Sequence, residues 1–453
     1  MCDIRRVLIA NRGEIALRIA RACRVAGVES VGIYSQADAA SAHLLLVDQA
    51  VCIGPAASAQ SYLDIERVIR VAILTGADAI HPGYGFLSEN ADFAAAVEQA
   101  GLVLIGPDAA VMRLMGDKIA AKQQMHRSGV PCLPGSDDAL PEDTQAIHAI
   151  ADNIGYPLII KAANGGGGRG MRVVHDRTGL EAAVVAAQEE AGRAFGKRTV
   201  YAERYLQHPR HIEVQILADR AGNAVWLGMR DCSIQRRHQK LVEESPPVGI
   251  SPEAMRNVGE RCVQACLDMG YVGAGTFEFL YEDDTFSFIE MNTRVQVEHP
   301  VTEMVTGMDI VREQILIAMG RPLSMTQADI NLRGHAIECR ITAEDPDTFQ
   351  PMPGRVETWR PPGGPGIRVD TQLYDGYTIP PQYDSLIAKI IAHGRDRADA
   401  MACMRAALEE MTIEGVATTA AFHRRLMDDP AFRKGAVSIH HLEKSMKRDD
   451  GHA

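Results

Sequence analysis

The chain has 453 residues, of which 46% are hydrophobic and 23% charged, and its formal net charge is −12. This length is too great for one hydrophobic core, so we expect two or three domains. The acidic balance argues against non-specific nucleic-acid binding, and no apolar run is long enough to cross a membrane. Nine scattered cysteines without a C-x-x-C pair indicate reduced thiols, and the apolar run 7–10 is too short for a signal peptide. We therefore expect a cytoplasmic protein.

Roughly the first 115 residues alternate apolar runs with helical patterns, which predicts a doubly wound parallel sheet. A helix that starts within residues 11–15 and runs to about Val25 is stopped by Gly27, and the turn before this helix lacks the G-x-G-x-x-G of a dinucleotide site. The segment His81–Phe86 follows the fourth strand and carries Tyr84. It fits a ligand contact and a tight turn with a packed aromatic equally well. The expected strands are at 7–10, 31–34, 49–53, 79–81 and 103–105.

The rest of the chain has a central part and a final part, so the fold class is α/β throughout. A helix over 110–128 carries Lys118, a compact α/β stretch runs to about residue 206, and a strand-rich core follows. Within this core a helix is predicted over Pro252–Met269, with Ser251 as its N-cap. A final α/β segment opens near His335, with helices at 398–411 and 418–426. The expected domains are 1–116, 117–330 with a lid over about 133–205, and 331–446, followed by a polar tail at 447–453.

A glycine-rich loop, residues 164–170, lies between two expected strands and is flanked by Lys161. No helix follows it directly and it lacks a G-K-[S/T] ending, so neither the Rossmann nor the P-loop motif applies. A glycine hairpin of this kind can lie over nucleotide phosphates and offer backbone N–H groups, as a mobile lid does. The alternative is a flexible surface turn.

Two acidic residues are predicted to face each other across a β-hairpin that runs from Gly275 to Glu290. With a turn near Asp284, Glu278 and Glu290 lie directly opposite, where like charges repel. A divalent cation between them relieves this repulsion, and Asn292 supplies a further oxygen. The alternative is a solvated hairpin face.

Every second residue from Glu290 to Glu298 is charged or carries an amide. If the segment is extended, these groups share one face and form a wall for a small anionic substrate and a metal. A cationic run, Asp231–Lys240, either faces these acids or is a solvated basic loop. The segment 201–206 is a candidate for reading an adenine edge.

Together these motifs resemble the biotin carboxylase family of ATP-grasp enzymes over nearly the whole chain. The family has a central ATP-grasp fold with a mobile lid. The resemblance implies carboxylation of a carrier-linked biotin with bicarbonate and ATP. The motifs that carry it are residues 10–15, 81–90, 115–118, 165–170, 230–233, 235–240, 273–279 and 290–300.

The resemblance implies a role for residues at matching positions. ATP is expected to contact Lys118, Lys161, Gly167, Gly168, Glu203, Arg204, Tyr205, Leu206, His211, Gln235, His238, Glu278 and Glu290. The metal, Mg²⁺ or Mn²⁺, is expected on Glu278, Glu290 and Asn292. Bicarbonate is expected on Lys240, Arg294, Gln296 and Val297. Glu298 is the implied base toward bicarbonate, Arg340 the group that stabilises the biotin enolate, and Tyr84 the neighbour of the biotin ring, so the catalytic set is Arg294, Glu298, Arg340 and Lys240.

The resemblance also implies partners. The sequence has no biotin-attachment Met-Lys-Met segment, so a biotin carboxyl carrier protein and carboxyltransferase subunits are expected as separate chains, with a homodimer of this chain. The expected role is the first half-reaction of acetyl-CoA, or related acyl-CoA, carboxylase in fatty acid biosynthesis. The alternatives are a pyruvate or other carboxylase, a different ATP-grasp carboxylate ligase, or a non-catalytic subunit. Asn164 stands where the family usually has glycine, which is expected to alter lid mobility.

Overall fold

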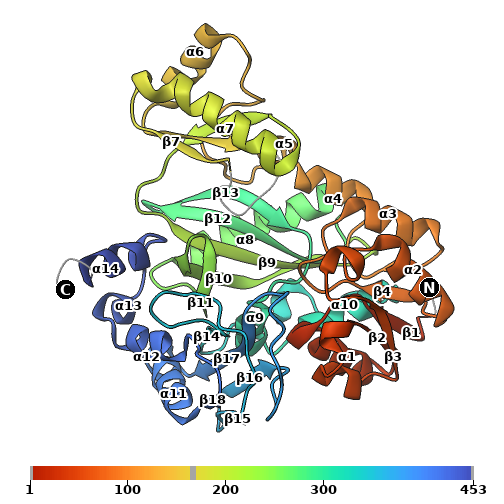
Figure 1. Ribbon diagram of the computed structural model, residues 1–453. Coiled ribbons are helices and arrows are strands. Elements are labelled where there is room, and N and C mark those ends of the chain that lie inside the picture. Colours follow the sequence, from red (N-terminus) through yellow and green to blue (C-terminus); the bar gives the residue numbers. More distant parts are fainter. Residues whose placement is uncertain (1–3, 164–169, 450–453) are drawn as a thin grey trace.

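The computed structural model describes residues 4–163 and 170–449 (Figure 1). The N-terminal part is a parallel five-stranded sheet in the order β3-β2-β1-β4-β5. This order, with helices between the strands, confirms the predicted doubly wound sheet. Its elements are β1 (Arg6–Ile9), α1 (Gly13–Ala26), β2 (Glu29–Ser35), β3 (Gln49–Gly54), α2 (Ile65–Leu74), β4 (Ala79–His81), α3 (Ala91–Gln99) and β5 (Val103–Leu104).

The single helix predicted over 110–128 is wrong, because the structure has two helices there. They are α4 (Ala109–Gly116) and α5 (Lys118–Arg127). Asp117 separates them with an extended backbone, and its side chain accepts hydrogen bonds from the amides of Ile119 and Ala120. An aspartate that caps a new helix in this way ends the preceding one.

A small α/β unit stands above the central sheet at the top of Figure 1. Its three-stranded sheet has the order β7-β6-β8, and α7 packs on it with a separate hydrophobic core. This unit corresponds to the segment that the sequence predicts as a lid. Its elements are α6 (Thr144–Ile154), β6 (Leu158–Ala162), β7 (Arg172–Val174), α7 (Leu180–Phe195) and β8 (Val200–Arg204).

The central part of the described chain is built on five antiparallel strands and their helices. The predicted helix Pro252–Met269 is confirmed as α8, and the Ser251 side chain caps it by accepting from the amide of Ala254. The predicted hairpin is confirmed as β12 and β13. The elements are β9 (Arg210–Ala218), β10 (Ala224–Arg236), β11 (Gln239–Ser245), α8 (Pro252–Met269), β12 (Gly273–Glu282), β13 (Thr285–Asn292), α9 (His299–Thr306) and α10 (Ile310–Ala318).

The C-terminal part continues the central sheet. Strand β14 pairs with β11, so one antiparallel eight-stranded sheet runs β13-β12-β9-β10-β11-β14-β17-β16. Residues from the hairpin and from the C-terminal part therefore belong to one sheet. The elements are β14 (His335–Thr342), β15 (Thr358–Arg360), β16 (Ile367–Thr371), β17 (Leu386–Gly394), α11 (Arg397–Glu410), β18 (Thr412–Glu414), α12 (Ala420–Asp428), α13 (Pro430–Lys434) and α14 (His441–Asp449).

None of the helices within residues 4–163 and 170–449 combines the length and the apolar composition that a bilayer crossing requires.

Candidate active site

Glu278 and Glu290 face each other across the β12–β13 hairpin, as predicted. Glu278 is buried, and Phe277 and Phe279 on either side of it are fully buried in the core, so the solvated-face alternative is wrong. The two acids are neutralised by cationic side chains. Lys118 Nζ donates to Glu290 Oε2 at 2.8 Å, whereas Glu278 has a lysine and a histidine as partners.

The partners of Glu278 come from neighbouring strands. Lys240 Nζ donates to Glu278 Oε1 at 2.9 Å, and His211 Nε2 lies 3.1 Å from Glu278 Oε2. Burial alone would lower the pKa of His211, but the Glu278 carboxylate raises it to about 9. His211 is therefore an imidazolium at neutral pH, and two cations converge on one acid.

The oxygen atoms of this hairpin suit a hard divalent cation. Two opposed carboxylates and an amide fit the few protein oxygens that Mg²⁺ takes beside phosphate and water. Asn292 Nδ2 donates to Glu278 Oε1 at 2.7 Å, and its Oδ1 accepts from Arg294 at 2.9 Å. These oxygen atoms therefore fit a divalent metal ion, and the cationic side chains described above lie beside the two acids.

Lys240 is the centre of the charge network. It donates to Glu213, to Glu278, and to Glu298 Oε1 at 2.7 Å. Lys240 thus faces the acids, and the solvated-loop alternative is wrong for this residue. Arg237 and His238, in the turn between β10 and β11, are exposed and have positive φ values. The predicted cationic patch is thus divided between the site and the solvent.

The prediction of one extended segment from Glu290 to Glu298 is wrong beyond Asn292. Strand β13 ends there, residues 293–298 form bends and turns, and α9 begins at His299. Pro300 lies in the first turn of α9, where a residue without an N–H is tolerated, so the chain turns into a helix instead of continuing as a strand.

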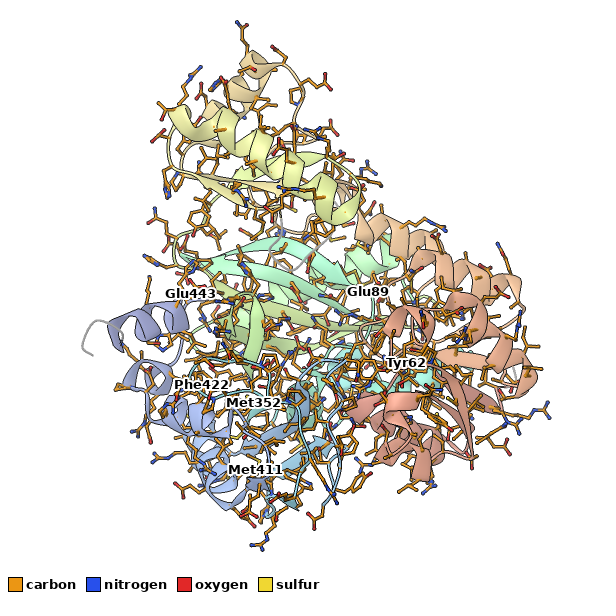
Figure 2. All side chains as sticks on the ribbon, viewed as in Figure 1. Tyr62, Glu89, Met352, Met411, Phe422 and Glu443 are labelled. Atoms are coloured by element: carbon orange, nitrogen blue, oxygen red, sulfur yellow. The ribbon has the colours of Figure 1, made fainter. Side chains whose placement is uncertain are left out.

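The polar groups of this turn nevertheless converge on the site. Gln296 Nε2 donates to Glu278 Oε1 at 2.8 Å. Arg294 Nε donates to Glu89 Oε2 at 2.8 Å, and Figure 2 shows Glu89 where the N-terminal part meets the central sheet. The Val297 carbonyl accepts a hydrogen bond from Lys389 Nζ of β17 at 2.8 Å. The turn therefore presents three of the predicted bicarbonate residues, Arg294, Gln296 and Val297, whereas the fourth, Lys240, lies on strand β11.

Glu298 is held between two cations. Lys240 Nζ lies 2.7 Å from Glu298 Oε1, and an Arg340 nitrogen lies 3.0 Å from Glu298 Oε2. Burial alone would raise the pKa of Glu298, but Lys240 first, then Arg340 and Arg230, bring it down to about 2. Glu298 is therefore a carboxylate at neutral pH, the form that accepts a proton.

Arg340 joins Glu298 to a second buried acid. Its Nε donates to Glu243 Oε1 at 2.6 Å. Burial raises the pKa of Glu243 to about 7, although Arg340 opposes the shift. Tyr84, the predicted biotin neighbour, donates its hydroxyl to Glu14. Burial and Glu14 raise the pKa of Tyr84 well above its ordinary value, so the hydroxyl keeps its proton.

Several predicted nucleotide residues lie on the sheet of the lid and on the central sheet, whereas Lys118 is the first residue of helix α5. Lys161 Nζ donates to Glu203 Oε2 at 2.7 Å, at the base of the lid. Arg204 instead donates to the carbonyl of Ile154 at 2.6 Å, so its side chain braces α6. Gln235 is buried beside His211, with 3.4 Å between Gln235 Nε2 and His211 Nδ1. Gly167, Gly168 and Asn164 lie outside the described residues.

Tyr205 and Leu206 follow β8 at the junction between the lid and the central sheet. The Tyr205 amide donates to the carbonyl of Pro157 at 3.0 Å. This backbone contact fixes the junction next to Lys161 and Glu203. The predicted adenine-reading segment is thus placed at the base of the lid.

Several charged residues of the site were missed by sequence reasoning. Arg230 is fully buried and donates to Glu213 at 3.0 Å and to Gln296 at 2.6 Å. A charged pair inside a largely apolar strand, Arg230 and Asp231, was the available signal, because a buried charge needs a buried partner. The residues missed are Glu14, Glu89, Glu213, Arg230, Glu243, Glu338 and Lys389.

Glu338 gives a prediction about stability. It is buried on β14, and neither carboxylate oxygen has a hydrogen-bond partner among the described residues. Burial raises the pKa of Glu338 well above its ordinary value. Lys389 opposes this rise, and Glu243 adds to it. A raised native pKa stabilises the fold at low pH, and this stability is lost as the pH rises from about 4.5 through the native value.

We therefore expect Glu338→Gln to gain melting temperature relative to the wild type as the pH rises. Thermal melts of both proteins between acidic and alkaline pH measure this difference. Glu357→Gln, at an exposed position, is the control and should follow the wild type. Parallel curves for Glu338→Gln and the wild type would contradict the prediction.

Three family models together match most of the chain. The model described as biotin carboxylase, N-terminal domain, matches residues 3–112. That of the carbamoyl-phosphate synthase L chain, ATP binding domain, matches 117–326, and that of the biotin carboxylase C-terminal domain matches 338–444.

Individual proteins match over nearly their full length. A biotin carboxylase of Pseudomonas aeruginosa is 58% identical over 446 residues, covering 98% of this chain and 99% of that protein. The crystal structure of a Campylobacter jejuni biotin carboxylase has a TM-score of 0.95 at 48% identity and covers 98% of this chain and 99% of that chain. The biotin carboxylase domain dimer of a Hydrogenobacter thermophilus 2-oxoglutarate carboxylase, solved with MgADP and bicarbonate, has a TM-score of 0.92 at 47% identity and covers 97% of each chain.

Proposed function

Because the chain belongs to the biotin carboxylase family and is an ATP-dependent ligase, we propose that it carboxylates biotin carried by a separate protein. Bicarbonate supplies the carboxyl group and ATP drives the reaction. The observation that carries this proposal is the position of Glu298. Its carboxylate lies between Lys240 and Arg340, and Lys240 also binds Glu278, one of the two opposed acids.

In the first step, the turn at residues 293–298 holds bicarbonate and Glu298 removes its proton. The resulting oxygen attacks the γ-phosphate of ATP to form carboxyphosphate and ADP. Negative charge then spreads over the transferring phosphoryl group, and Lys240 and Arg294 stabilise it. The buried position of the Glu298 carboxylate, between Lys240 and Arg340, supports its role as the proton acceptor.

In the second step, carboxyphosphate yields CO₂ and phosphate, and the phosphate removes the proton from biotin N1. The biotin enolate carries negative charge on its ureido oxygen, and Arg340 holds this oxygen. The enolate nitrogen then takes up CO₂ to give carboxybiotin. Two observations support this placement of Arg340: it contacts Glu298, and it opposes the rise in the pKa of Tyr84 that burial and Glu14 cause.

The opposed acids are the proposed metal ligands, with Asn292 as a third donor. Mg²⁺ or Mn²⁺, if bound by these residues, would neutralise negative charge on the phosphates of ATP. Lys118 and Lys240 already lie against the same acids and add positive charge at the place where the phosphates are expected.

We expect Glu278→Gln and Glu290→Gln each to raise the Mg²⁺ concentration needed for half-maximal ATP turnover and to lower the turnover strongly. Each change removes one negative charge from the metal site. Magnesium titrations of ATP turnover measure the effect. Asp283→Asn in the exposed turn of the same hairpin is the control, and unchanged magnesium dependence in both glutamine variants would refute the paired-ligand assignment.

The test of the proposed function is ATP cleavage measured with and without bicarbonate and free biotin. We expect ADP formation to depend on bicarbonate, and carboxybiotin to form only when biotin is added. ATP cleavage indifferent to both compounds would instead support a ligase acting on another carboxylate, and no cleavage would support a non-catalytic subunit.

For the physiological setting, we propose a cytoplasmic homodimer that works with a biotin carboxyl carrier protein and carboxyltransferase subunits. Acetyl-CoA or a related acyl-CoA is the proposed final acceptor. The relative from Hydrogenobacter thermophilus is named for a different acceptor, 2-oxoglutarate. Capture of the endogenous biotinylated partner, followed by carboxylation assays with acyl-CoAs, pyruvate and 2-oxoglutarate, distinguishes these acceptors.

A further inference from the structure

Lys389 is a fully buried lysine in the middle of strand β17. It pairs in register with Arg340 of β14 on one side and Asp370 of β16 on the other. An ammonium removed from water is costly unless partners compensate for the lost hydration. The identity of these partners therefore shows what the residue does.

The shortest contact of Lys389 is to a backbone carbonyl. Its Nζ donates to the Val297 oxygen at 2.8 Å, whereas the nearest carboxylate oxygens, of Glu14 and Asp370, lie at 3.1 and 3.8 Å. Val297 belongs to the turn at residues 293–298, which is neither strand nor helix. A turn without ladder hydrogen bonds depends on such side chains for its conformation.

The residues on either side of Val297 have the groups that the proposed chemistry needs. Gln296 is bonded to Glu278 and Arg230, and Glu298 to Lys240 and Arg340. A displacement of the Val297 carbonyl moves both neighbours. Lys389 itself has no contact with Lys118, Lys161 or Glu203 among the interactions of the described residues.

The second partner of Lys389 connects it to the predicted biotin side. Glu14 Oε1 lies 3.1 Å from Lys389 Nζ and also accepts the hydrogen bond from the Tyr84 hydroxyl. The other Glu14 oxygen is buried without a hydrogen-bond partner among the described residues. One carboxylate oxygen thus joins a lysine of β17 to a tyrosine of the loop after β4.

We propose that Lys389 is a positioning residue that fixes the Gln296–Glu298 turn for bicarbonate and, through Glu14, couples this turn to Tyr84 at the biotin side. This inference rests on the proposed function and deepens it. The bridge joins helix α1, the turn before α9 and strand β17, which come from the three parts of the chain. Burial would lower the pKa of Lys389, but Glu14 first, and then Glu338 and Asp370, raise it, so the ammonium keeps its charge.

The test is a set of steady-state measurements on Lys389→Met, Lys389→Arg and Glu14→Gln. We expect Lys389→Met to raise the KM for bicarbonate by about 10- to 100-fold, the loss expected for one charge-assisted hydrogen bond. Its KM for ATP should stay near the wild-type value. Lys389→Arg retains the charge and should restore part of the bicarbonate affinity. Lys434→Met, an exposed lysine of α13, is the matched control.

Glu14→Gln keeps the shape of the side chain but weakens its bonds to both Lys389 and Tyr84. We expect the KM values for bicarbonate and for biotin to rise together in this variant. A role in fold stability alone would lower the melting temperature and kcat and leave the ratios of the KM values unchanged. If Lys389→Met does not fold, Lys389→Arg and Glu14→Gln decide between the two roles.

The wild-type measurement separates the inference from the proposed function. A wild-type protein whose ATP cleavage ignores bicarbonate overturns the proposed function and, with it, the inference. An active wild type whose Glu14→Gln and lysine variants keep unchanged KM values for bicarbonate and biotin overturns the inference alone.

Discussion

Replacing Glu298 by glutamine is expected to lower bicarbonate-dependent ATP cleavage by about 10²- to 10⁴-fold, the usual loss for a general base. Nucleotide affinity should stay near the wild-type value, because Glu298 is bonded to Lys240 and Arg340 and is not among the proposed ATP ligands. The amide retains the size of the carboxylate but has neither its charge nor its basicity. The rate of ADP formation against bicarbonate concentration, with ADP affinity from calorimetry, measures both effects.

The charge network around Glu298 bears on whether the Glu298→Gln variant still folds. Removal of its charge also leaves Lys240 with one carboxylate fewer, although Glu213 and Glu278 still bind it. The fold should therefore survive, and the melting temperature tests this. Glu66→Gln, an exposed acid on α2, is the control. Biotin carboxylation near the wild-type rate by Glu298→Gln would exclude Glu298 as the base.

The regular elements were predictable from sequence because their signals are local. Helix α8 has the predicted bounds, Pro252–Met269, since a capping serine precedes it and Gly270, with φ of 63°, ends it. The same reasoning joined α4 and α5 into one helix. Periodicity alone does not show that Asp117 turns its side chain back to cap a new helix.

The candidate site was predictable where its contacts are short in sequence. Glu278 and Glu290 belong to one hairpin, so alternation and a turn position were enough to place them opposite each other. The extended interpretation failed after Asn292, because the helix that starts at His299 requires the chain to turn first.

The partners of the catalytic residues were not predictable in the same way. Arg340 and Glu243 are 97 positions apart, and strands β11 and β14 bring them together only in the folded sheet. No local pattern sets that register. Lys389 was visible as a charge in an apolar strand, and Glu338 as an acid two residues before Arg340, but the sequence does not identify the groups that face them.

Arg340→Ala is expected to leave bicarbonate-dependent ATP cleavage largely intact while biotin carboxylation falls, so that ADP and carboxybiotin no longer form in proportion. A charge stabilises only the step at which its partner charge develops, and we place Arg340 at the enolate. The variant loses a contact to Glu298, but Lys240 remains at 2.7 Å and is the larger cause of the low Glu298 pKa. Glu243, whose pKa is already about 7, can take up a proton when its arginine is removed.

Arg294→Ala should instead depress both products together, because we place Arg294 at the phosphoryl transfer that precedes both. Its neighbour Glu89, at 2.8 Å from Arg294 Nε, remains half-exposed and can be solvated in the variant. ADP and carboxybiotin are measured side by side in the same reaction, and Arg395→Ala, a highly exposed arginine, is the control. Equal proportional losses of both products in Arg340→Ala would show that the two arginines do not act at separate steps. If only Arg340→Ala loses more carboxybiotin than ADP, the Arg340 charge acts at the step after ATP cleavage, in which the biotin oxyanion forms.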